Sequence, residues 1–473
     1  MGSGERRLSE VIMTEYKHSV SLDVSKCTGC TTCLRRCPTE AIRIRNGRAV
    51  ISPVKCIDCG ECIKVCQHKA KKAVHDSLSC LEKYKYKVAL PAPSLYGQFD
   101  HMDNIGYIIR GLKDLGFDDV FEVACAAELV SAYTRLYIKR SDVKKPVISS
   151  ACPTISRMIS MNYPFLIENV MPILPPVDIA AYLAHEHAKT VHPELEEEEI
   201  GIVFISPCPA KVSYVKNDFA GERNYITDVV SIRDVYFSLL DVMKKREDEP
   251  LEATESGLIG IGWATTGGEA TAIFNERYLA ADGIENCIRV LDQIDNEDIT
   301  SLDFVELNAC DGGCVGGAMT VANPYIAQAR LQALKRYLPV SPNRPASEWI
   351  PSQFFNENSI EYTPALLLSE DRRIARQMMS EIESIKESLP GIDCGSCGAP
   401  TCMAFAEDIV RGEANVDECT VIMKMLFHRY LEEHKEKSVL DKLASDGAFK
   451  KSARAGEETP GNASGSNPEG EAE

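Results

Sequence analysis

The stretch "IGIVFISPCPAK", residues 200–211, joins a strand-like run to a single cysteine. Its first seven residues are apolar or small, which is the length and composition of a buried β-strand. The run stops at Pro207, and Cys208 follows directly. In α/β domains, ligands bind at the carboxyl edge of the sheet, where the loops after the strands converge. The stretch therefore predicts a strand that brings one thiol to a site.

Two other stretches have the same organisation. "KKPVISSACP" (144–153) ends a β-type run at Cys152, and "DFVELNACDGGC" (303–314) leads to Cys310 and Cys314. "KVALPAPS" (87–94) and "LIGIGWATTGG" (258–268) also read as strands that end at this edge, without cysteine. Four thiolates from three loops could surround one iron–sulfur cubane. The alternative is a set of ordinary buried core cysteines, but each cysteine has proline or glycine close by, which favours a bulky cofactor near the main chain.

Two cysteine runs near the N-terminus repeat one spacing. "CTGCTTCLRRCP" starts at residue 27 and "CIDCGECIKVC" at residue 56. This spacing is typical of bacterial ferredoxins with two 4Fe-4S clusters, in which the fourth cysteine of each run crosses to the other cluster. The predicted ligand sets are Cys27, Cys30, Cys33 and Cys66 for the first cluster, and Cys56, Cys59, Cys62 and Cys37 for the second. Zinc is the alternative, although zinc sites rarely repeat four closely spaced cysteines twice.

A third cluster of cysteines lies near the C-terminus. "CGSCGAPTCMAFAEDIVRGEANVDEC" contains Cys394, Cys397, Cys402 and Cys419. It resembles the small 4Fe-4S domain of electron-transport and corrinoid proteins, and a zinc ribbon is the alternative. Helical apolar spacing in residues 369–389 predicts an amphipathic helix before it, and residues 420–437 predict another after it. The last three cysteines, Cys80, Cys125 and Cys287, are expected to be buried structural thiols.

Charge and hydropathy exclude several classes of partner. The 473 residues contain 52 Lys and Arg against 70 Asp and Glu, a formal net charge of -18. Nucleic acid and anionic membranes would repel such a chain. No apolar run approaches the roughly 20 residues that span a bilayer, and no secretory signal pattern opens the sequence. We therefore expect a cytoplasmic protein with no membrane span and no nucleic-acid partner.

The strand-end motifs, taken together, resemble the signatures of FeFe hydrogenases. "SSACP", "SPCPAK" and "ELNACDGGCVGG" are similar to the three cysteine signatures of that family, and "LPAPS" and "GWATTGG" to two further pocket stretches. The active-site H-cluster of this family joins a 4Fe-4S cubane to a two-iron unit that carries CO, cyanide and a bridging dithiolate. The resemblance covers roughly residues 23–345 and implies an H-cluster, two ferredoxin-type 4Fe-4S clusters and one C-terminal 4Fe-4S cluster.

The resemblance also implies roles for single residues. Cys152, Cys208, Cys310 and Cys314 would hold the cubane, Cys314 would also bridge to the two-iron unit, and Lys211 would donate a hydrogen bond to a cyanide ligand. The other residues expected at the cofactor are Ala92, Pro93, Ala151, Pro153, Ser206, Pro207, Asn308 and Gly313.

The implied fold is a multidomain α+β and α/β protein. It has a bacterial ferredoxin-like domain, a two-lobed α/β H-cluster domain and a small, mostly helical 4Fe-4S domain. The expected division is a flexible lead-in (1–22), the two-cluster ferredoxin domain (23–78), the H-cluster domain (79–365), the C-terminal 4Fe-4S domain (366–432) and a disordered acidic tail (433–473).

The chain departs from the family near the two-iron unit. Enzymes that turn over rapidly have a second cysteine before the cubane cysteine, and its thiol passes protons; here this residue is Ala151. A methyl group cannot titrate, whereas a thiol titrates near pH 8.5. Ser206 and Asn308 stand where the family usually has methionines, and Tyr214 where it usually has a glutamate. The cluster ligands are kept while the expected proton supply is missing.

This pattern favours the sensory (hydrogen- or redox-sensing) branch of the family. Such a protein would bind H2, interconvert it slowly with protons and electrons, and report through its clusters to a redox partner such as ferredoxin, or to a signalling kinase or phosphatase. Two alternatives stay open. One is a metabolic hydrogenase or hydrogenase subunit with a different proton route through Ser149, Ser150 or Tyr214. The other is an iron–sulfur electron-transfer or assembly scaffold that lacks the two-iron unit.

Overall fold

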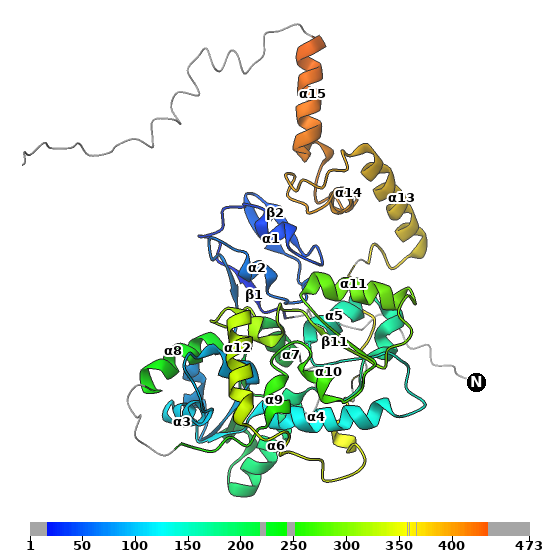
Figure 1. Ribbon diagram of the computed structural model, residues 1–473. Coiled ribbons are helices and arrows are strands. Elements are labelled where there is room, and N and C mark those ends of the chain that lie inside the picture. The colour runs from blue at the N-terminus through cyan, green and yellow to red at the C-terminus, as the bar shows by residue number, and fades with distance from the viewer. Residues whose placement is uncertain are drawn as a thin grey trace, which may run out of the picture.

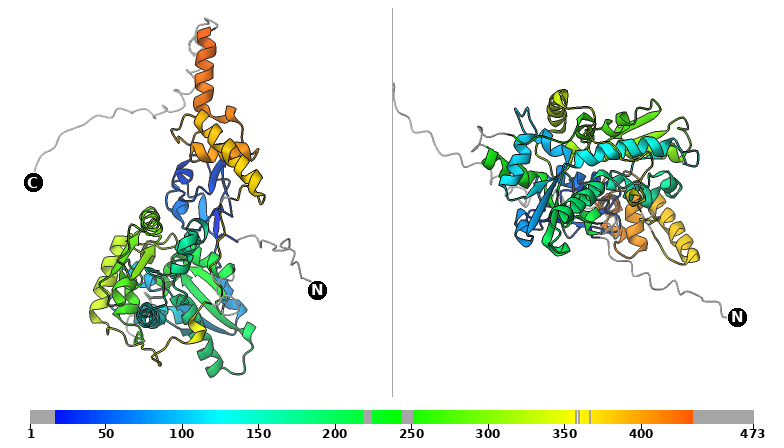
Figure 2. Two further views of the ribbon diagram at one scale, coloured as in Figure 1. Left: turned by 90° about the vertical axis from the view of Figure 1, so that its right-hand side faces the viewer. Right: turned by 90° about the horizontal axis from the view of Figure 1, so that it is seen from below.

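The computed structural model describes residues 17–217, 224–243, 251–356, 358, 360–365 and 367–433. The described chain forms three parts whose order in space differs from their order in the sequence. Figures 1 and 2 show the N-terminal ferredoxin-like part between the large α/β domain and the C-terminal helical domain. The predicted acidic tail lies outside the described residues, except for its first residue, 433, which ends α15. None of the helices in the described ranges is long and apolar enough to cross a bilayer.

The ferredoxin-like part consists of two similar halves. Its elements are β1 (Val20–Leu22), α1 (Thr32–Arg35), β2 (Ile42–Arg45), β3 (Arg48–Ile51), α2 (Glu61–Lys64) and β4 (Lys71–Ala73). β1 pairs antiparallel with β4, and β2 with β3. Corresponding positions in the two cysteine runs have the same left-handed backbone: Gly29 and Asp58, Thr31 and Gly60, Glu40 and Lys69. The repeat in the sequence is therefore also a repeat in backbone conformation.

The predicted flexible lead-in extends too far along the chain. Residues 17–22 were included in it, but Val20–Leu22 form β1 and pair with Lys71–Ala73. The pairing buries Val20, which explains why this polar-looking segment is ordered. Residues 1–16 of the lead-in lie outside the described chain.

The large domain has two lobes, each built on a parallel sheet. The first sheet has the order β6-β5-β8-β9 and the second β10-β11-β7, with all neighbours parallel. The strands are β5 (Tyr86–Pro91), β6 (Asp119–Val120), β7 (Val147–Ile148), β8 (Ile200–Ser206), β9 (Asp228–Ser231), β10 (Tyr278–Asp282) and β11 (Phe304–Asn308). β8 is buried along its whole length, as its unbroken apolar run predicts for a central parallel strand.

Helices cover both sheets. Those of the first lobe are α3 (Gly106–Asp114), α4 (Val123–Ile138), α6 (Pro176–Val191), α7 (Pro209–Lys216), α8 (Ile232–Met243), α9 (Leu258–Gly262) and α12 (Pro324–Leu334). Those of the second lobe are α5 (Pro153–Asn162), α10 (Gly268–Ala272) and α11 (Ile284–Asp295). Two buried clusters, one in each lobe, form the core, and this confirms the two-lobed α/β prediction.

One predicted strand is wrong. The run that begins at Leu258 forms the short helix α9 and not a strand. Gly260 explains the difference, because a Cβ at this position would lie 2.1 Å from the carbonyl oxygen of Ala124. This close approach to α4 is a tertiary contact, and a short apolar run does not distinguish a strand from a buried helix.

The C-terminal domain is helical, as expected. It comprises α13 (Arg372–Ser388), α14 (Cys402–Val410) and α15 (Thr420–Glu433). Asp371 and Thr401 cap α13 and α14 by accepting hydrogen bonds from the backbone N–H groups of Arg373 and Ala404. Ile382 and Phe405 belong to a small hydrophobic core that is formed by residues of this domain alone. This core is separate from the two cores of the large domain.

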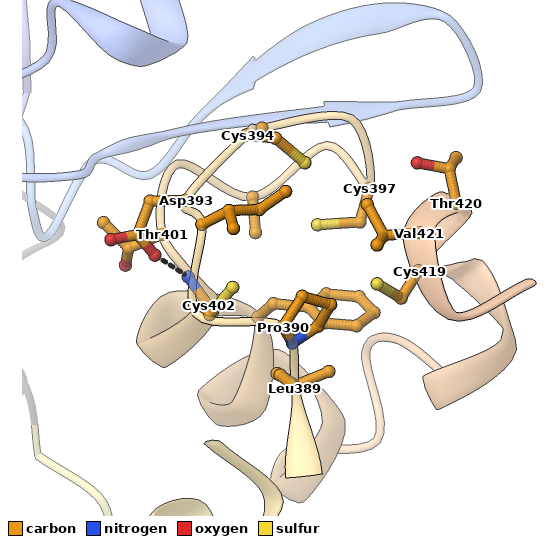
Figure 3. A pocket seen from close by; sticks show the side chains of 14 residues that line it. Leu389, Pro390, Asp393, Cys394, Cys397, Thr401, Cys402, Cys419, Thr420 and Val421 are labelled. Carbon is orange, nitrogen blue, oxygen red and sulfur yellow. Dashed lines mark hydrogen bonds between the residues drawn. The ribbon is translucent and has the colours of Figure 1, made fainter. Parts of the chain in front are cut away.

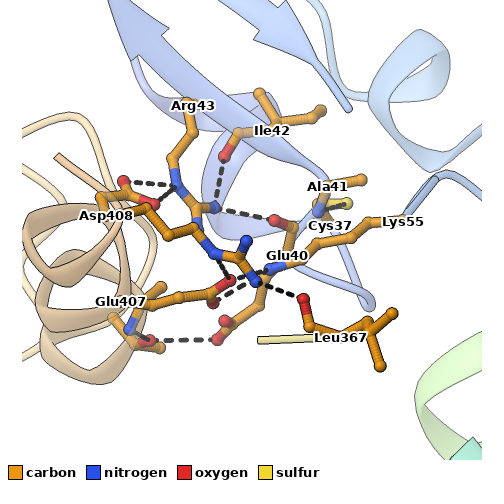
Figure 4. Close-up of polar contacts among 12 residues, drawn as sticks. Cys37, Glu40, Ala41, Ile42, Arg43, Lys55, Leu367, Glu407 and Asp408 are labelled. Carbon is orange, nitrogen blue, oxygen red and sulfur yellow. Dashed lines mark hydrogen bonds and ion pairs between the residues drawn. The ribbon is translucent and has the colours of Figure 1, made fainter. Parts of the chain in front are cut away.

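The C-terminal domain docks on β2 and its surroundings in the ferredoxin-like part (Figure 4). Arg43 donates to both carboxylate oxygens of Asp408, at 3.0 and 2.7 Å, and Lys55 pairs with Glu407 at 3.0 Å. The backbone N–H of Ile44 donates to the carbonyl oxygen of Gly398 at 2.8 Å. These ion pairs are largely buried and joined to a backbone hydrogen bond, so the two domains have a defined relative position.

We expect Gly398→Ala to loosen this docking. Gly398 has a φ of +85°, and a Cβ would lie 2.3 Å from the carbonyl oxygen of Ile44. The matched control is Gly412→Ala, since Gly412 has a φ of +73° but no neighbouring atom within 4 Å. Both variants lose about 1 kcal/mol from the left-handed backbone, and Gly398→Ala loses about 1–3 kcal/mol more from the clash. Thermal unfolding and the rate of proteolytic release of the C-terminal domain measure the difference; equal effects would contradict this account of the interface.

Candidate metal centres

The four strand-end cysteines of the large domain meet at one site. Cys152, Cys208 and Cys310 follow β7, β8 and β11, and Cys314 begins a short 3-10 turn (Cys314–Gly316). Burial raises the pKa of Cys208 to about 11 and that of Cys310 to about 12, and the nearby Cys152 thiol contributes to both shifts. Burial also raises the pKa of Cys314, with further contributions from the other three thiols. We refer to these four residues as the strand-end site.

Glycines allow the loops of this site to approach one another closely. A Cβ on Gly317 would lie 2.2 Å from the carbonyl oxygen of Pro207, and one on Gly313 would lie 2.7 Å from the backbone nitrogen of Thr266. The backbone N–H of Met319 donates to Pro207 at 2.9 Å. The third cysteine loop is thus fastened to the second one, and this explains why so many glycines follow Cys310.

Lys211 has a carboxylate neighbour that the sequence did not reveal. Its Nζ lies 4.8 Å from the centroid of the Tyr214 ring, and the Tyr214 hydroxyl donates to Asp178 at 2.6 Å. Asp178, in α6, is only 2% exposed. The positive charge of Lys211 lowers the pKa of Cys208, Cys314 and Asp178, which opposes the effect of burial on each. Tyr214 therefore connects the lysine to a buried acid from another helix.

The residues next to the cysteines mostly bond to the protein itself. The backbone N–H of Ala151 donates to Ser149 Oγ at 3.2 Å. Ser206 Oγ donates to the carbonyl oxygen of Cys208 at 3.0 Å, and Asn308 Nδ2 donates to Glu306 at 2.6 Å. Among the other expected pocket residues, Ala92 and Pro207 are buried, Pro93 begins a 3-10 turn (Pro93–Gln98) and Pro153 begins α5.

Two buried acids near this site were missed by the sequence analysis. Glu269 lies in α10 and Glu306 in β11, and each is 3% exposed. Ser149 Oγ donates to Glu269 at 2.6 Å. Glu306 could have been noticed, because a charged residue in a buried strand is unusual. Glu269 follows two glycines in an otherwise uncharged stretch, but only the fold shows that the two acids are close.

The first ferredoxin ligand set lines one pocket. Its lining includes Cys27, Cys30, Cys33 and Cys66, so the fourth cysteine of the second run crosses to the first, as the spacing predicts. The sulfurs accept backbone hydrogen bonds, from Ala49 to Cys27 at 3.5 Å and from Ala70 to Cys66 at 3.3 Å. Amide donors of this kind stabilise thiolates that are bound to iron.

The second ferredoxin set is also brought together. Burial raises the pKa of Cys62 to about 12, and Cys37, from the other run, contributes to this shift as well as to those of Cys56 and Cys59. The backbone N–H of Ala41 donates to Cys37 at 3.2 Å, in the same relative position as the bond from Ala70 to Cys66. The two halves therefore provide the same backbone donor to the fourth cysteine of each run.

The C-terminal cysteines line a pocket of their own. Figure 3 shows the sulfurs of Cys394, Cys397, Cys402 and Cys419 around one space between the loop and the start of α15. Asp393 accepts from the backbone N–H of Cys402 at 2.6 Å and holds the loop closed. Four convergent sulfurs fit either a 4Fe-4S cluster or zinc.

The three remaining cysteines are buried, as expected. Cys287 donates to the carbonyl oxygen of Asn308 at 3.3 Å, so this structural thiol lies against the strand that leads to the strand-end site. The donor chemistry of all four sets fits iron–sulfur groups, because four neighbouring thiolates repel one another unless a metal offsets their charge.

Comparisons with known proteins agree with this arrangement. Residues 85–278 and 264–318 match the family described as the iron only hydrogenase large subunit, C-terminal domain. Residues 19–67 match a 4Fe-4S dicluster domain, and residues 389–421 match a putative Fe-S cluster family.

Two curated relatives cover most of the same region. The periplasmic Fe hydrogenase large subunit of Nitratidesulfovibrio vulgaris is 24% identical over 377 residues, which are 66% of this chain and 88% of the relative. Iron hydrogenase 1 of Clostridium pasteurianum is 24% identical over 389 residues, which are 66% of this chain and 66% of the relative. A solved apo FeFe hydrogenase from Chlamydomonas reinhardtii aligns with a TM-score of 0.43 and 18% identity, over 57% of this chain and 91% of that one. The family match, the dicluster match and the relatives together show that this chain belongs to the iron-only (FeFe) hydrogenase large-subunit family.

Proposed function

We propose that this chain is a sensory FeFe hydrogenase. It binds H2 at an H-cluster, interconverts H2 slowly with protons and electrons, and relays the redox change through 4Fe-4S clusters to a signalling partner. The observation that carries the proposal is the contrast at the strand-end site. All four cysteines that could hold the cubane converge, yet the residue before Cys152 is Ala151, whose side chain cannot exchange a proton.

The surrounding residues suit the binding of such a cofactor. When bound, the H-cluster supplies the metal at which H2 is split. Cys152, Cys208, Cys310 and Cys314 would hold it, and Lys211 would place a positive charge beside its anionic ligands. The lysine contacts the ring of Tyr214, and the position of that ring is fixed by the 2.6 Å hydrogen bond from its hydroxyl to Asp178.

The domain contacts support an electron route away from this site. Gly60, between Cys59 and Cys62, lies so close to the large domain that a Cβ would be 2.6 Å from the Ala318 Cβ. On the opposite side, Ile44 lines the first ferredoxin pocket, and its N–H donates to Gly398, next to Cys397. The second ferredoxin cluster would therefore adjoin the H-cluster, and the first would adjoin the C-terminal cluster.

The electrons that carry the redox change would leave the chain from the C-terminal domain. A redox partner such as ferredoxin, or a signalling kinase or phosphatase, would receive them there. We place the protein in the cytoplasm, where reducing conditions keep thiols available to iron, although the relative from N. vulgaris is named as periplasmic.

Iron content tests the ligand sets. We expect Cys66→Ser and Cys419→Ser each to lower the iron content of anaerobically purified protein by about four atoms per chain, because each removes one ligand of a different cubane. Cys80→Ser is the matched control, since Cys80 is buried and outside all four sets. Iron and sulfide analysis with electron paramagnetic resonance makes the comparison; zinc in place of iron in the C-terminal domain would refute that assignment.

Infrared spectra and film electrochemistry test the function. Matured protein should show CO and cyanide bands that change between H2 and inert gas, and its catalytic current should be low. We expect Ala151→Cys to raise turnover by roughly 100-fold, the usual contribution of a positioned acid–base group. Ala365→Cys, the same change at a half-buried position outside the site, should leave turnover unchanged. Fast turnover of the unaltered protein would favour a metabolic hydrogenase, and absent CO and cyanide bands would favour a scaffold without the two-iron unit.

A further inference from the structure

One lysine of the ferredoxin-like part is buried without a partner of its own. Lys71, in β4, is only 3% exposed, and its Nζ has no hydrogen-bond partner among the described residues. An ammonium group in a protein interior is costly unless a charge of opposite sign lies nearby. Lys71 lines the same pocket as the four cysteines of the first ferredoxin set. The thiolates of that set are therefore the charges that can compensate it.

The internal repeat shows that folding alone does not require a lysine here. The backbone N–H groups of Ala41 and Ala70 donate to the fourth sulfur of each run, so these two residues are equivalent. The next residue is Ile42 in the first half and Lys71 in the second. Ile42 is 2% exposed and belongs to a hydrophobic cluster that includes cysteines of both ligand sets. An apolar side chain fills this position in one half, and the other half places a cation there.

The charge of Lys71 acts on sulfurs of both ferredoxin sets. It lowers the pKa of Cys33, in the first set, and of Cys62, in the second, and in both it opposes the effect of burial. A cubane gains negative charge when it is reduced. A cation that stabilises the thiolates therefore also stabilises the reduced cluster, which raises its reduction potential.

A buried acid lies beside the second set, on the side of the large domain. Asp58 is 1% exposed, and its Oδ1 lies 3.7 Å from the sulfur of Cys56. Its carboxylate accepts from the backbone N–H of Ser19 at 2.9 Å and from Ser213 Oγ, in α7, at 2.7 Å. The charge of Asp58 raises the pKa of both Cys56 and Cys62. At the second site an anion thus opposes the cation of Lys71.

We propose that Lys71 and Asp58 together determine the direction of electron flow through the ferredoxin-like part. Lys71 raises the reduction potential of the first cluster, and Asp58 lowers that of the second. An electron shared by the two clusters then resides mainly on the first, the one that adjoins the C-terminal domain. Its transfer oxidises the second cluster and reduces the first, and no proton moves. This inference rests on the proposed function for the two ferredoxin-type clusters and not for the H-cluster.

Potentiometric titration of the full chain as purified, followed by electron paramagnetic resonance, tests the role of the lysine. The first cluster, identified by the signal that Cys66→Ser loses, should be reduced at a higher potential than the second. We expect Lys71→Ile, which copies Ile42, to lower the reduced-to-oxidised ratio of the first cluster roughly tenfold at a fixed potential, equivalent to about 59 mV. Lys71→Met, which keeps the length of the side chain, should do the same. The matched control is Lys72→Ile, because the Lys72 side chain is 54% exposed and pairs with Asp23.

The acid is tested in the same titration. Asp58→Asn should raise the potential of the second cluster and narrow the difference between the two. Unchanged potentials in both Lys71 variants would overturn the proposal, as would a first cluster that is reduced at a lower potential than the second. Loss of iron from both Lys71 variants, with Lys72→Ile intact, would also overturn it, because the lysine would then be structural.

The proposed function can fail separately. Matured protein without CO and cyanide bands would refute the hydrogenase assignment. The potentials are measured without the two-iron unit, so they would still decide the roles of Lys71 and Asp58.

Discussion

The cost of burying charge on sulfur is the constraint on which this structure depends. A thiolate removed from water needs a positive partner. At the strand-end site, burial raises the pKa values of Cys208, Cys310 and Cys314, and the charges of Lys211 and Lys64 only partly oppose this effect. A bound metal would supply the positive charge that these sulfurs need as thiolates. The parallel sheets, whose strand ends converge, and the glycines after Cys310, which let the loops approach, both serve this one requirement.

Much of the site was predictable because the information is local. The spacing of the two ferredoxin runs predicted that Cys37 and Cys66 each lie among the cysteines of the other run, since short turns determine where nearby sulfurs can point. The run from Ile200 to Ser206 predicted β8 because a strand buried on both faces is apolar throughout. The strand predicted at 258–268 was wrong because contact with Ala124, far away in sequence, decided its conformation. Asp178 and Glu269 were missed for the same reason, as each matters only through a partner from another element.

The departures from the family pattern occur in both lobes: Ser206 and Tyr214 lie in β8 and α7, and Ala151 and Asn308 follow or end β7 and β11. Near the strand-end site, the backbone N–H of Ala151 donates to Ser149 Oγ, and Asn308 Nδ2 donates to Glu306. Towards the ferredoxin-like part, Gly60 and Ala318 keep the domains in close contact. If clusters occupy the cysteine sites, this contact would give electrons a direct route to the ferredoxin-like part, whereas no thiol stands at Ala151 to pass a proton. Both features agree with the slow turnover that we propose.

The docking of the C-terminal domain also protects a strand. β2 pairs with β3 on one side only, and on the other side the Ile44 N–H is satisfied by Gly398. An uncovered strand edge is a template for pairing with another chain. A form of the protein that loses this domain to proteolysis or oxidation would expose that edge together with the cations of Arg43 and Arg45. Loss of the C-terminal domain would then be followed by self-association of the remaining chain.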